Sequence, residues 1–239
     1  LAGDFSSVVS KAKKQIEKGA HIIDVNMGVP GEDEASLMKR AVLELQKNTK
    51  AILCIDSSDA LALEEGLKHF HGRAILNSVD GNEKKLQSFL PIAKKYGAMI
   101  IGLALDDRGV ETKAKERLEI SKKIIRIAKK YNIPKQDIII DGLTLTVGAQ
   151  QKFAMEALET VRLVKQELNC LTTLGLSNIS HGVPQRHLLN NTFLAMALSY
   201  GLDFPMMDPS LESTREIIAA AEFLLGRDVG GKNYVNISS

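Results

Sequence analysis

Seven apolar, strand-like runs, each separated from the next by a helical pattern, constrain the fold of this chain more than any other feature. They start roughly 30 residues apart, which is the spacing of repeated strand–helix units. Most of them are apolar at consecutive positions, as expected for parallel strands that are buried on both faces. The expected strands are His21–Asn26, Ala51–Asp56, Ala74–Asn77, Ala98–Leu103, Ile138–Asp141, Thr172–Leu176 and Asp203–Met206.

The segments between these runs carry apolar residues at helical spacing. Phe153, Ala157 and Val161, for example, recur in steps of four and therefore share one helix face. Helices are expected at Ser6–Lys18, Asp33–Gln46, Ala60–Phe70, Glu83–Lys95, around Leu118–Ala128, and at Phe153–Leu168, Arg186–Tyr200 and Ser210–Leu225.

This alternation predicts an α/β fold, a (β/α)8 TIM barrel. The chain opens on a helix, so an eight-stranded barrel requires one more strand before Leu1, and we expect the first strand to be missing from this sequence. A doubly wound open sheet is the alternative, but it usually carries a G-x-G-x-x-G loop after its first strand, and this sequence has none. We expect one barrel domain over 1–226 and an irregular tail over 227–239.

The charge balance and the cysteines exclude several function classes. Lys plus Arg total 31 and Asp plus Glu total 29, so the net charge of +2 argues against nucleic acid as a partner. No signal peptide or membrane-length apolar run occurs, which predicts a soluble cytoplasmic protein with no membrane partner. Cys54 and Cys170 share no metal-ligand spacing, and the histidines show none either, so no metal site is expected.

Polar residues follow four of the expected strands. Asp56, Asn77, Asp141 and Asn178 all lie where a buried strand ends. A carboxylate there needs hydrogen bonds, and each Asp could instead cap the following helix, a reading that is stronger for Asp24. Their coincidence at the carboxyl ends of four parallel strands favours a ligand pocket, the place where barrels keep their chemistry. Carboxylates and amides together suit a flat, polar heterocycle.

Five segments carry a resemblance to a known family. They are GAHIIDVNMG (Gly19–Gly28), CIDSSD (Cys54–Asp59), AILNSVDG (Ala74–Gly81), IIDGLTLTVG (Ile139–Gly148) and the block from LGLSN to YGLD (Leu174–Asp203). In this order they resemble the dihydropteroate-synthase-like, pterin-binding barrel of cobalamin-dependent methyltransferases. That family includes methyltetrahydrofolate:corrinoid protein methyltransferase and the folate domain of cobalamin-dependent methionine synthase.

The resemblance implies a role for each strand-end residue. Asp56, Asn77 and Asp141 would hydrogen bond to the pterin ring, and Asn178 would reach the nitrogen that carries the methyl group. Asn26 would line the floor of the pocket. The family's first strand ends in a Gly-Glu-Arg-like run that this sequence lacks.

Two more residues belong to the expected rim. Arg186 matches a rim arginine of the family, and His181 lies three residues beyond Asn178 in the loop. Both are expected to contribute to substrate binding.

The activity implied is methyl transfer between N5 of methyltetrahydrofolate and the cobalt of a separate corrinoid protein, in either direction. The sequence has no D-x-H-x-x-G loop, so cobalamin is expected on a partner protein, and the barrel is expected to form a homodimer. One alternative is pterin condensation like that of dihydropteroate synthase. That family's seventh and eighth strands usually supply a Lys and an Arg-x-His, where this chain has GLSN (Gly175–Asn178) and MMDP (Met206–Pro209). A non-catalytic folate-binding module is the other alternative.

Overall fold

The computed structural model describes residues 5–210 and 212–238. These residues form two compact units. Unit 1 comprises Leu1–Leu103 and Lys123–Ile139, and unit 2 comprises Ala104–Lys122 and Ile140–Ser239. Helix α5 (Ala114–Lys130) and strand β5 (Ile138–Asp141) contribute residues to both units. The expectation of one barrel domain over 1–226 stays a prediction.

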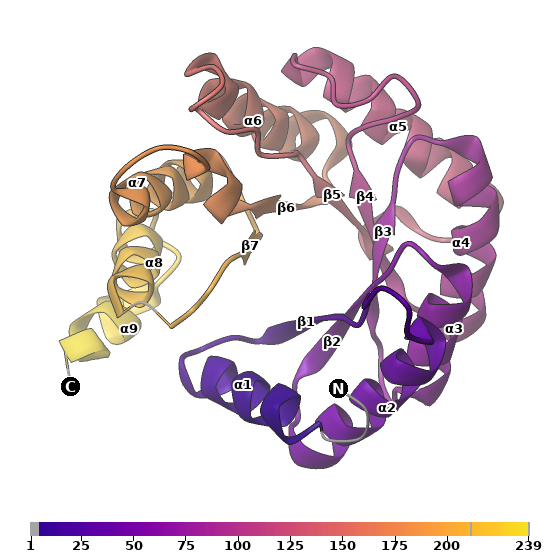
Figure 1. The fold of residues 1–239 in the computed structure, drawn as a ribbon. Coiled ribbons are helices and arrows are strands. Elements are labelled where there is room, and N and C mark those ends of the chain that lie inside the picture. The colour runs from indigo at the N-terminus through magenta and orange to yellow at the C-terminus, as the bar shows by residue number, and fades with distance from the viewer. Residues whose placement is uncertain (1–4, 211, 239) are drawn as a thin grey trace. The chain divides into compact units, whose positions relative to one another are not determined.

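Unit 1 is a parallel strand–helix layer. Its strands are β1 (Ile22–Asn26), β2 (Ile52–Asp56), β3 (Ile75–Val79) and β4 (Met99–Leu103), and its helices are α1 (Ser6–Glu17), α2 (Glu34–Asn48), α3 (Ala60–His69), α4 (Glu83–Tyr96) and the short η1 (Lys135–Asp137). The four strands pair in chain order, and every pair is parallel. Figure 1 shows α2, α3 and α4 along one side of these strands.

Helices α2, α3 and α4 begin where the loops after β1, β2 and β3 supply a capping side chain. Asp33, Asp59 and Asn82 each accept a hydrogen bond from a backbone N–H of the first turn of the helix that follows. Such a cap satisfies a donor that a helix leaves unpaired. Gly66 lets α3 approach β2 closely, because a Cβ there would lie 2.7 Å from Cγ2 of Ile55. The layer therefore fixes where each strand stops.

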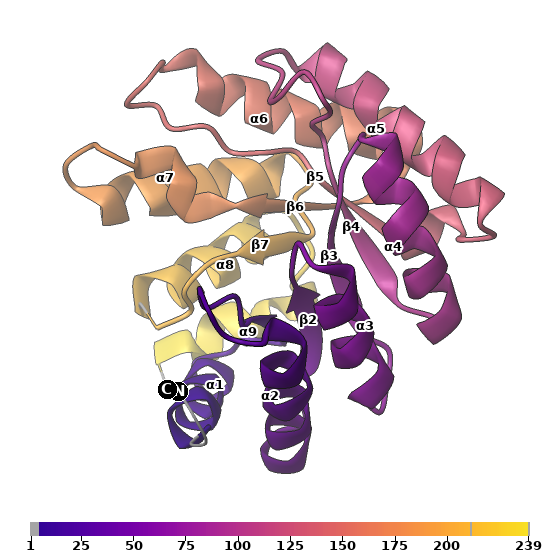
Figure 2. The ribbon, with the colours of Figure 1, turned by 45° about the vertical axis from the view of Figure 1, so that its right-hand side comes forward.

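Unit 2 contains the later strands and their helices. They are β6 (Leu171–Gly175), β7 (Phe204–Met206), α6 (Lys152–Leu163) with its π-helical end η2 (Val164–Leu168), the 3-10 turn η3 (Leu176–Ser180), α7 (Arg186–Ser199) and α8 (Glu212–Leu224). Strands β6 and β7 pair in parallel. Figure 2 shows α6, α7 and α8 in succession beside β6 and β7. Leu174, Val161 and Phe193 belong to one buried cluster that joins β6 to α6 and α7.

The seven strands expected from the sequence are all present, and their ends agree within two residues. The predicted and observed strands agree because the apolar runs indicate buried residues, and most of the strands are indeed buried at their centres. Leu53, Ile55 and Leu76, for example, have no exposed surface. Within 5–210 and 212–238, no helix has the length and apolarity needed to cross a membrane.

The segment after Arg227, where the sequence predicts an irregular tail, contains short helical turns, and its separation from the barrel domain stays a prediction. It forms the turn η4 (Val229–Gly231), the short helix α9 (Lys232–Val235) and the turn η5 (Asn236–Ser238). The carboxylate of Asp228 accepts hydrogen bonds from the backbone N–H groups of Asn233 and Tyr234. The Tyr234 ring stacks on Phe223 with centroids 5.1 Å apart. These two anchors order a segment whose glycines and missing apolar period suggest a loop.

Candidate functional site at the strand ends

Three of the expected site residues lie side by side in unit 1. Asn26 of β1 pairs in register with Asp56 of β2, and Asp56 pairs in register with Asn77 of β3. Because residues in register on parallel strands point to the same face of the sheet, the three side chains form one row at the carboxyl ends. The structure therefore brings together the carboxylate and both amides that the sequence predicted for this unit.

Hydrogen bonds fix the amide of Asn26 at both ends. Its Nδ2 donates to Oδ2 of Asp56 over 2.9 Å, and its Oδ1 accepts from the backbone N–H of Gly28 over 3.0 Å. The orientation of this amide is thus determined by its partners. Asn26 therefore holds one carboxylate oxygen of Asp56 in place. Among the hydrogen bonds of the described residues, the other oxygen of Asp56 accepts none. That oxygen is open to an N–H group of a ligand.

A second row lies one layer below, where Asp24 of β1 pairs in register with Cys54 of β2. Oδ1 of Asp24 accepts a hydrogen bond from Nδ2 of Asn77 over 3.2 Å, and the Cys54 thiol also hydrogen bonds to Asp24. This contact turns the carbonyl oxygen of Asn77 away from Asp24. Asp24 therefore helps to orient a candidate site residue, whereas its sequence context favours helix capping.

The electrostatics of the second row follow from burial. Although Asp24 is open to solvent along the edge of β1, its carboxyl group lies against Cys54 and Asn77. Desolvation by burial raises the pKa of Asp24, and the nearby Asp56 adds to this, whereas the hydrogen bonds from Cys54 and Asn77 lower it. Burial, together with the charges of Asp24 and Asp56, raises the pKa of Cys54 well above its ordinary value. Cys54 is therefore a neutral thiol.

A buried serine holds the loop that follows β2. Oγ of Ser57 donates to Oε1 of Glu34 over 2.5 Å and accepts from the backbone N–H of Asp59 over 2.9 Å. This pair of bonds ties the end of β2 to the first turn of α2. Asp56, the residue before Ser57, is held in place by the same loop.

In unit 2, Asp141 at the end of β5 is bound by its own loop. Its Oδ1 accepts from the backbone N–H of Leu143 over 2.8 Å, and Leu143 adopts a left-handed conformation with φ of 61°. Burial raises the pKa of Asp141 to about 6, although the Leu143 N–H and the positive charge of Arg117 both act to lower it. Asp141 is thus a carboxyl group that changes charge just below neutral pH.

Asn178 lies in η3, directly after β6, and its side chain is exposed. The amide lies over Gly175, where an added Cβ would come within 3.2 Å of Nδ2 of Asn178. Arg186 holds the turn from the other side, because its Nε donates to Oγ of Ser180 and its Nη2 donates to the carbonyl of Ser177, both over 3.0 Å. The structure therefore gives Arg186 a positioning role toward Asn178. Its contact with substrate stays a prediction.

His181 joins the two loops of unit 2 through its backbone. Its carbonyl accepts from Oγ1 of Thr146 over 2.6 Å, and its N–H donates to the carbonyl of Asn178 over 3.3 Å. The N–H of Val147 also donates to the carbonyl of Ile179 over 2.9 Å. The loop after β5 and the loop after β6 are therefore linked, while the role predicted for the His181 ring stays untested.

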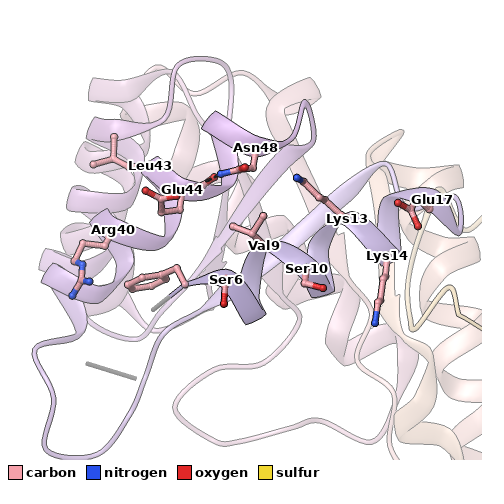
Figure 3. Close-up of a pocket in the computed structure, with 11 residues that line it drawn as sticks. Ser6, Val9, Ser10, Lys13, Lys14, Glu17, Arg40, Leu43, Glu44 and Asn48 are labelled. Atoms are coloured by element: carbon pink, nitrogen blue, oxygen red, sulfur yellow. Dashed lines mark hydrogen bonds between the residues drawn. The ribbon is translucent and has the colours of Figure 1, made fainter. Parts of the chain in front are cut away.

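A groove of about 770 Å³ lies between α1 and α2, and Figure 3 shows side chains from both helices around it. Phe5 also lines this groove. The guanidinium of Arg40 lies 4.8 Å from the centroid of the Phe5 ring. The groove is lined by helix side chains such as Lys13 and Glu44, and by none of the strand-end residues. In the described residues, no group of three or more His, Cys, Asp or Glu side chains could hold a metal ion. The strand ends, rather than this groove, combine the groups suited to a heterocycle.

A family model described as "Pterin binding enzyme" matches residues 1–206. Methionine synthase of Mycobacterium tuberculosis is 31% identical over 88% of this chain, and the chain spans only 19% of that protein's length. Methylcorrinoid:tetrahydrofolate methyltransferase of Eubacterium limosum is 29% identical, with 94% of this chain and 84% of the relative covered.

Solved structures show the same fold at low identity. A Yersinia pestis dihydropteroate synthase, solved with a pterine–sulfa conjugate, has a TM-score of 0.74 and 16% identity, and covers 94% of this chain and 90% of its own. This likeness shows the fold, which is a TIM barrel of the dihydropteroate synthase type. The seven strands that the structure describes are consistent with such a barrel without its first strand.

Proposed function

The chain belongs to the pterin binding enzyme family, and on that premise we propose that it transfers a methyl group between N5 of methyltetrahydrofolate and the cobalt of a corrinoid protein. The relative from Eubacterium limosum, which is similar over most of both chains, supports this choice of reaction. The observation that carries the proposal is the registered row of Asn26, Asp56 and Asn77.

The row suits the edge of a pterin ring. A carboxylate accepts two parallel N–H bonds from neighbouring ring and exocyclic nitrogens, and an amide reads the adjacent donors and acceptors. The free oxygen of Asp56 would take an N–H of the ring, and the carbonyl of Asn77 would accept another. Asp141, in its ionised form, would accept a further N–H. The bonds from Asp56 and Asn77 would hold the ring in one orientation, as in-line transfer of the methyl group requires.

Asn178 would act on the nitrogen that releases the methyl group. When the N5–methyl bond breaks, its electron pair stays on N5, which must gain a proton. A donor aimed at this nitrogen meets a weak base in the ground state and developing negative charge in the transition state, so its bond strengthens along the reaction. The amide of Asn178 is exposed, and Arg186 holds the turn that carries it through the carbonyl of Ser177. This amide would supply such a donor while water delivers the proton.

The corrinoid would come from a partner protein, whose cobalt exchanges the methyl group with N5. We also propose that the protein is cytoplasmic. We further propose that it forms a homodimer, and gel filtration tests this oligomeric state. The chain matches only a fifth of the methionine synthase, so the activity of that whole protein is not transferred to this chain.

Pterin condensation is the second candidate, because the likeness in fold extends to dihydropteroate synthases. Release of pyrophosphate requires cations at the strand ends. The loops after β6 and β7 carry Asn178 and Asp208 instead, and Arg186, the arginine of the first loop, is bonded to the Ser180 hydroxyl and the Ser177 carbonyl. These residues favour methyl transfer over condensation.

The decisive experiment mixes the purified protein with methyltetrahydrofolate and cob(I)alamin and follows methylcobalamin by absorbance. The reverse mixture, tetrahydrofolate with methylcobalamin, tests the other direction. Asn48→Ala, an exposed change at the end of α2, serves as the matched control for Asn178→Ala. Tight binding of the folate without turnover in either direction would identify a non-catalytic module. Turnover with a pterin pyrophosphate and p-aminobenzoate would identify a synthase.

A further inference from the structure

Arg117 of α5 is a charged side chain with no exposed surface. Its Nη1 donates to the carbonyl oxygens of Gly142 and Leu143, each over 2.8 Å, and its Nε donates to the carbonyl of Glu111 over 2.8 Å. Two of these three acceptors lie immediately after Asp141. A single planar guanidinium thus clamps the loop that follows β5.

The clamp acts on the residue that binds Asp141. Leu143 has a positive φ of 61°, a conformation that is unfavourable for a side chain larger than glycine. In this conformation its N–H points at the Asp141 carboxylate, while its carbonyl is held by Arg117. We infer that Arg117 is a positioning residue, which keeps the loop after β5 in the conformation that presents Asp141 to a ligand. The inference deepens the proposed function, because the ligand it assumes is the folate.

Burial of this arginine is hard to explain by stability alone. Its Nη2 is buried without a hydrogen-bond partner among the described residues. A buried cation that is incompletely satisfied costs free energy, and an apolar side chain of similar volume often packs at least as well. The buried charge therefore points to a use beyond packing.

The charge of Arg117 acts on Asp141. Glu156 on α6 also faces Arg117, and it is itself bonded to Lys113 and to the N–H of Ala114. Strand β6, which bonds to the loop through Gly142, contains no titratable residue. Burial lowers the pKa of Arg117, yet an arginine stays cationic at any pH at which proteins fold. Its charge opposes the effect of burial on Asp141 and so favours the carboxylate.

Two variants separate the charge from the clamp. Arg117→Gln removes the charge, and Arg117→Lys keeps the charge but loses the planar fork. Arg126→Gln is the matched control, because Arg126 lies on the same helix and is exposed. The first measurement is the NMR titration of the Asp141 carboxyl carbon, assigned by its loss in Asp141→Asn. The second is the dissociation constant for methyltetrahydrofolate between pH 5 and 9, and the third is hydrogen exchange of the Leu143 amide.

In Arg117→Gln, the titration midpoint of Asp141 should rise from about 6 by roughly one unit or more, because an attractive charge is lost. Folate affinity at pH 7 should fall roughly tenfold or more, as when charged hydrogen bonds are broken. In Arg117→Lys, the midpoint should stay near that of the wild type, while the Leu143 amide exchanges faster and affinity is still reduced at pH 9.

A midpoint, an amide exchange rate and an affinity equal to those of the wild type in folded variants would overturn the inference. If Arg117→Gln does not fold, Arg117→Lys decides through the exchange rate and the affinity at pH 9. Failure of the wild-type protein to bind the folate at any pH would reject the proposed function. The Asp141 titration and the Leu143 exchange would even then test the role of Arg117.

Discussion

The two units hold their candidate site residues in different ways. In unit 1, Asn26, Asp56 and Asn77 lie on adjacent strands and are bonded to one another or to Asp24 through side chains. In unit 2, Asp141 and Asn178 lie at loops whose backbones are held by arginines. Strand register fixes the first group, and loop conformation fixes the second. The effects of two substitutions in unit 1 on folate binding should therefore be non-additive. The effects of substitutions in unit 2 should instead depend on the conformation of the loop that carries each residue.

The largest effect is expected in unit 2, at Asn178. Asn178→Ala should lower the turnover number by ~10²–10³-fold, the typical loss when one transition-state donor is removed. The Michaelis constant for methyltetrahydrofolate should change much less, because the bond strengthens as charge develops. The measurement is methyl transfer to free cob(I)alamin at saturating folate, which removes partner docking. A turnover number within twofold of the wild type, combined with a collapse in affinity, would make Asn178 a binding residue.

The next largest effect concerns binding at Asp141. Asp141→Asn should weaken methyltetrahydrofolate binding by about 1–3 kcal/mol, since a charged acceptor is replaced by a neutral one. Wild-type affinity should fall as the pH drops below about 6, where Asp141 becomes protonated, and the variant should lack this dependence. Calorimetric titration from pH 5 to 8 measures both. Equal affinity of variant and wild type at pH 8 would show that Asp141 does not bind the folate.

The same substitution should have the opposite effect on stability. The pKa of Asp141 is about 6 in the folded chain against an ordinary value of 3.8, so folding favours the protonated form. The stability contributed by the neutral carboxyl is fully present below about pH 4 and is lost as the pH rises through 6. Asp141→Asn should therefore gain about 1–3 kcal/mol over the wild type between pH 4 and pH 8. Thermal unfolding at both pH values measures this, and a difference that does not change with pH would contradict it.

The smallest effect tests side-chain coupling in unit 1. Asn26→Ala and Asp56→Asn should be non-additive in folate binding, with a coupling free energy of about 0.5–1 kcal/mol, because the two side chains share a hydrogen bond. As a control, Asn26→Ala combined with Asn48→Ala should be additive. Strict additivity in the first pair would mean that the register of the strands, and not the side-chain bond, holds Asp56.

The sequence predicted the strands because apolar runs are a local pattern, and the structure places the candidate residues Asp56 and Asn77 at the expected strand ends. Apolar runs locate the strands, and a polar residue at the end of each run locates the rim. The sequence favours a structural role for Asp24, because its hydrogen-bond partner Asn77 lies on another strand, although Asp24 shares a strand face with Asn26. The register that joins them is not visible in one sequence.

Arg117 was not predicted, for a different reason. Its acceptors are backbone carbonyls of the loop after β5, and a carbonyl is present at every residue. The one available signal is its place on the apolar face of α5, three residues after Ala114 and four before Ser121, both of which are buried. The orientation of the Asn26 amide and the turn that carries Asn178 likewise depend on backbone geometry, which residue types do not specify.

The protonated Cys54 has a consequence for chemical handling of the protein. Thiolates, rather than thiols, react with alkylating agents and peroxides, and Cys54 is both neutral and only 3% exposed. The sulfur one layer below the candidate site is therefore shielded from iodoacetamide and from mild oxidants while the chain is folded. Cys170, also buried, has 2% exposure. Labelling of either cysteine would thus report unfolding of the chain.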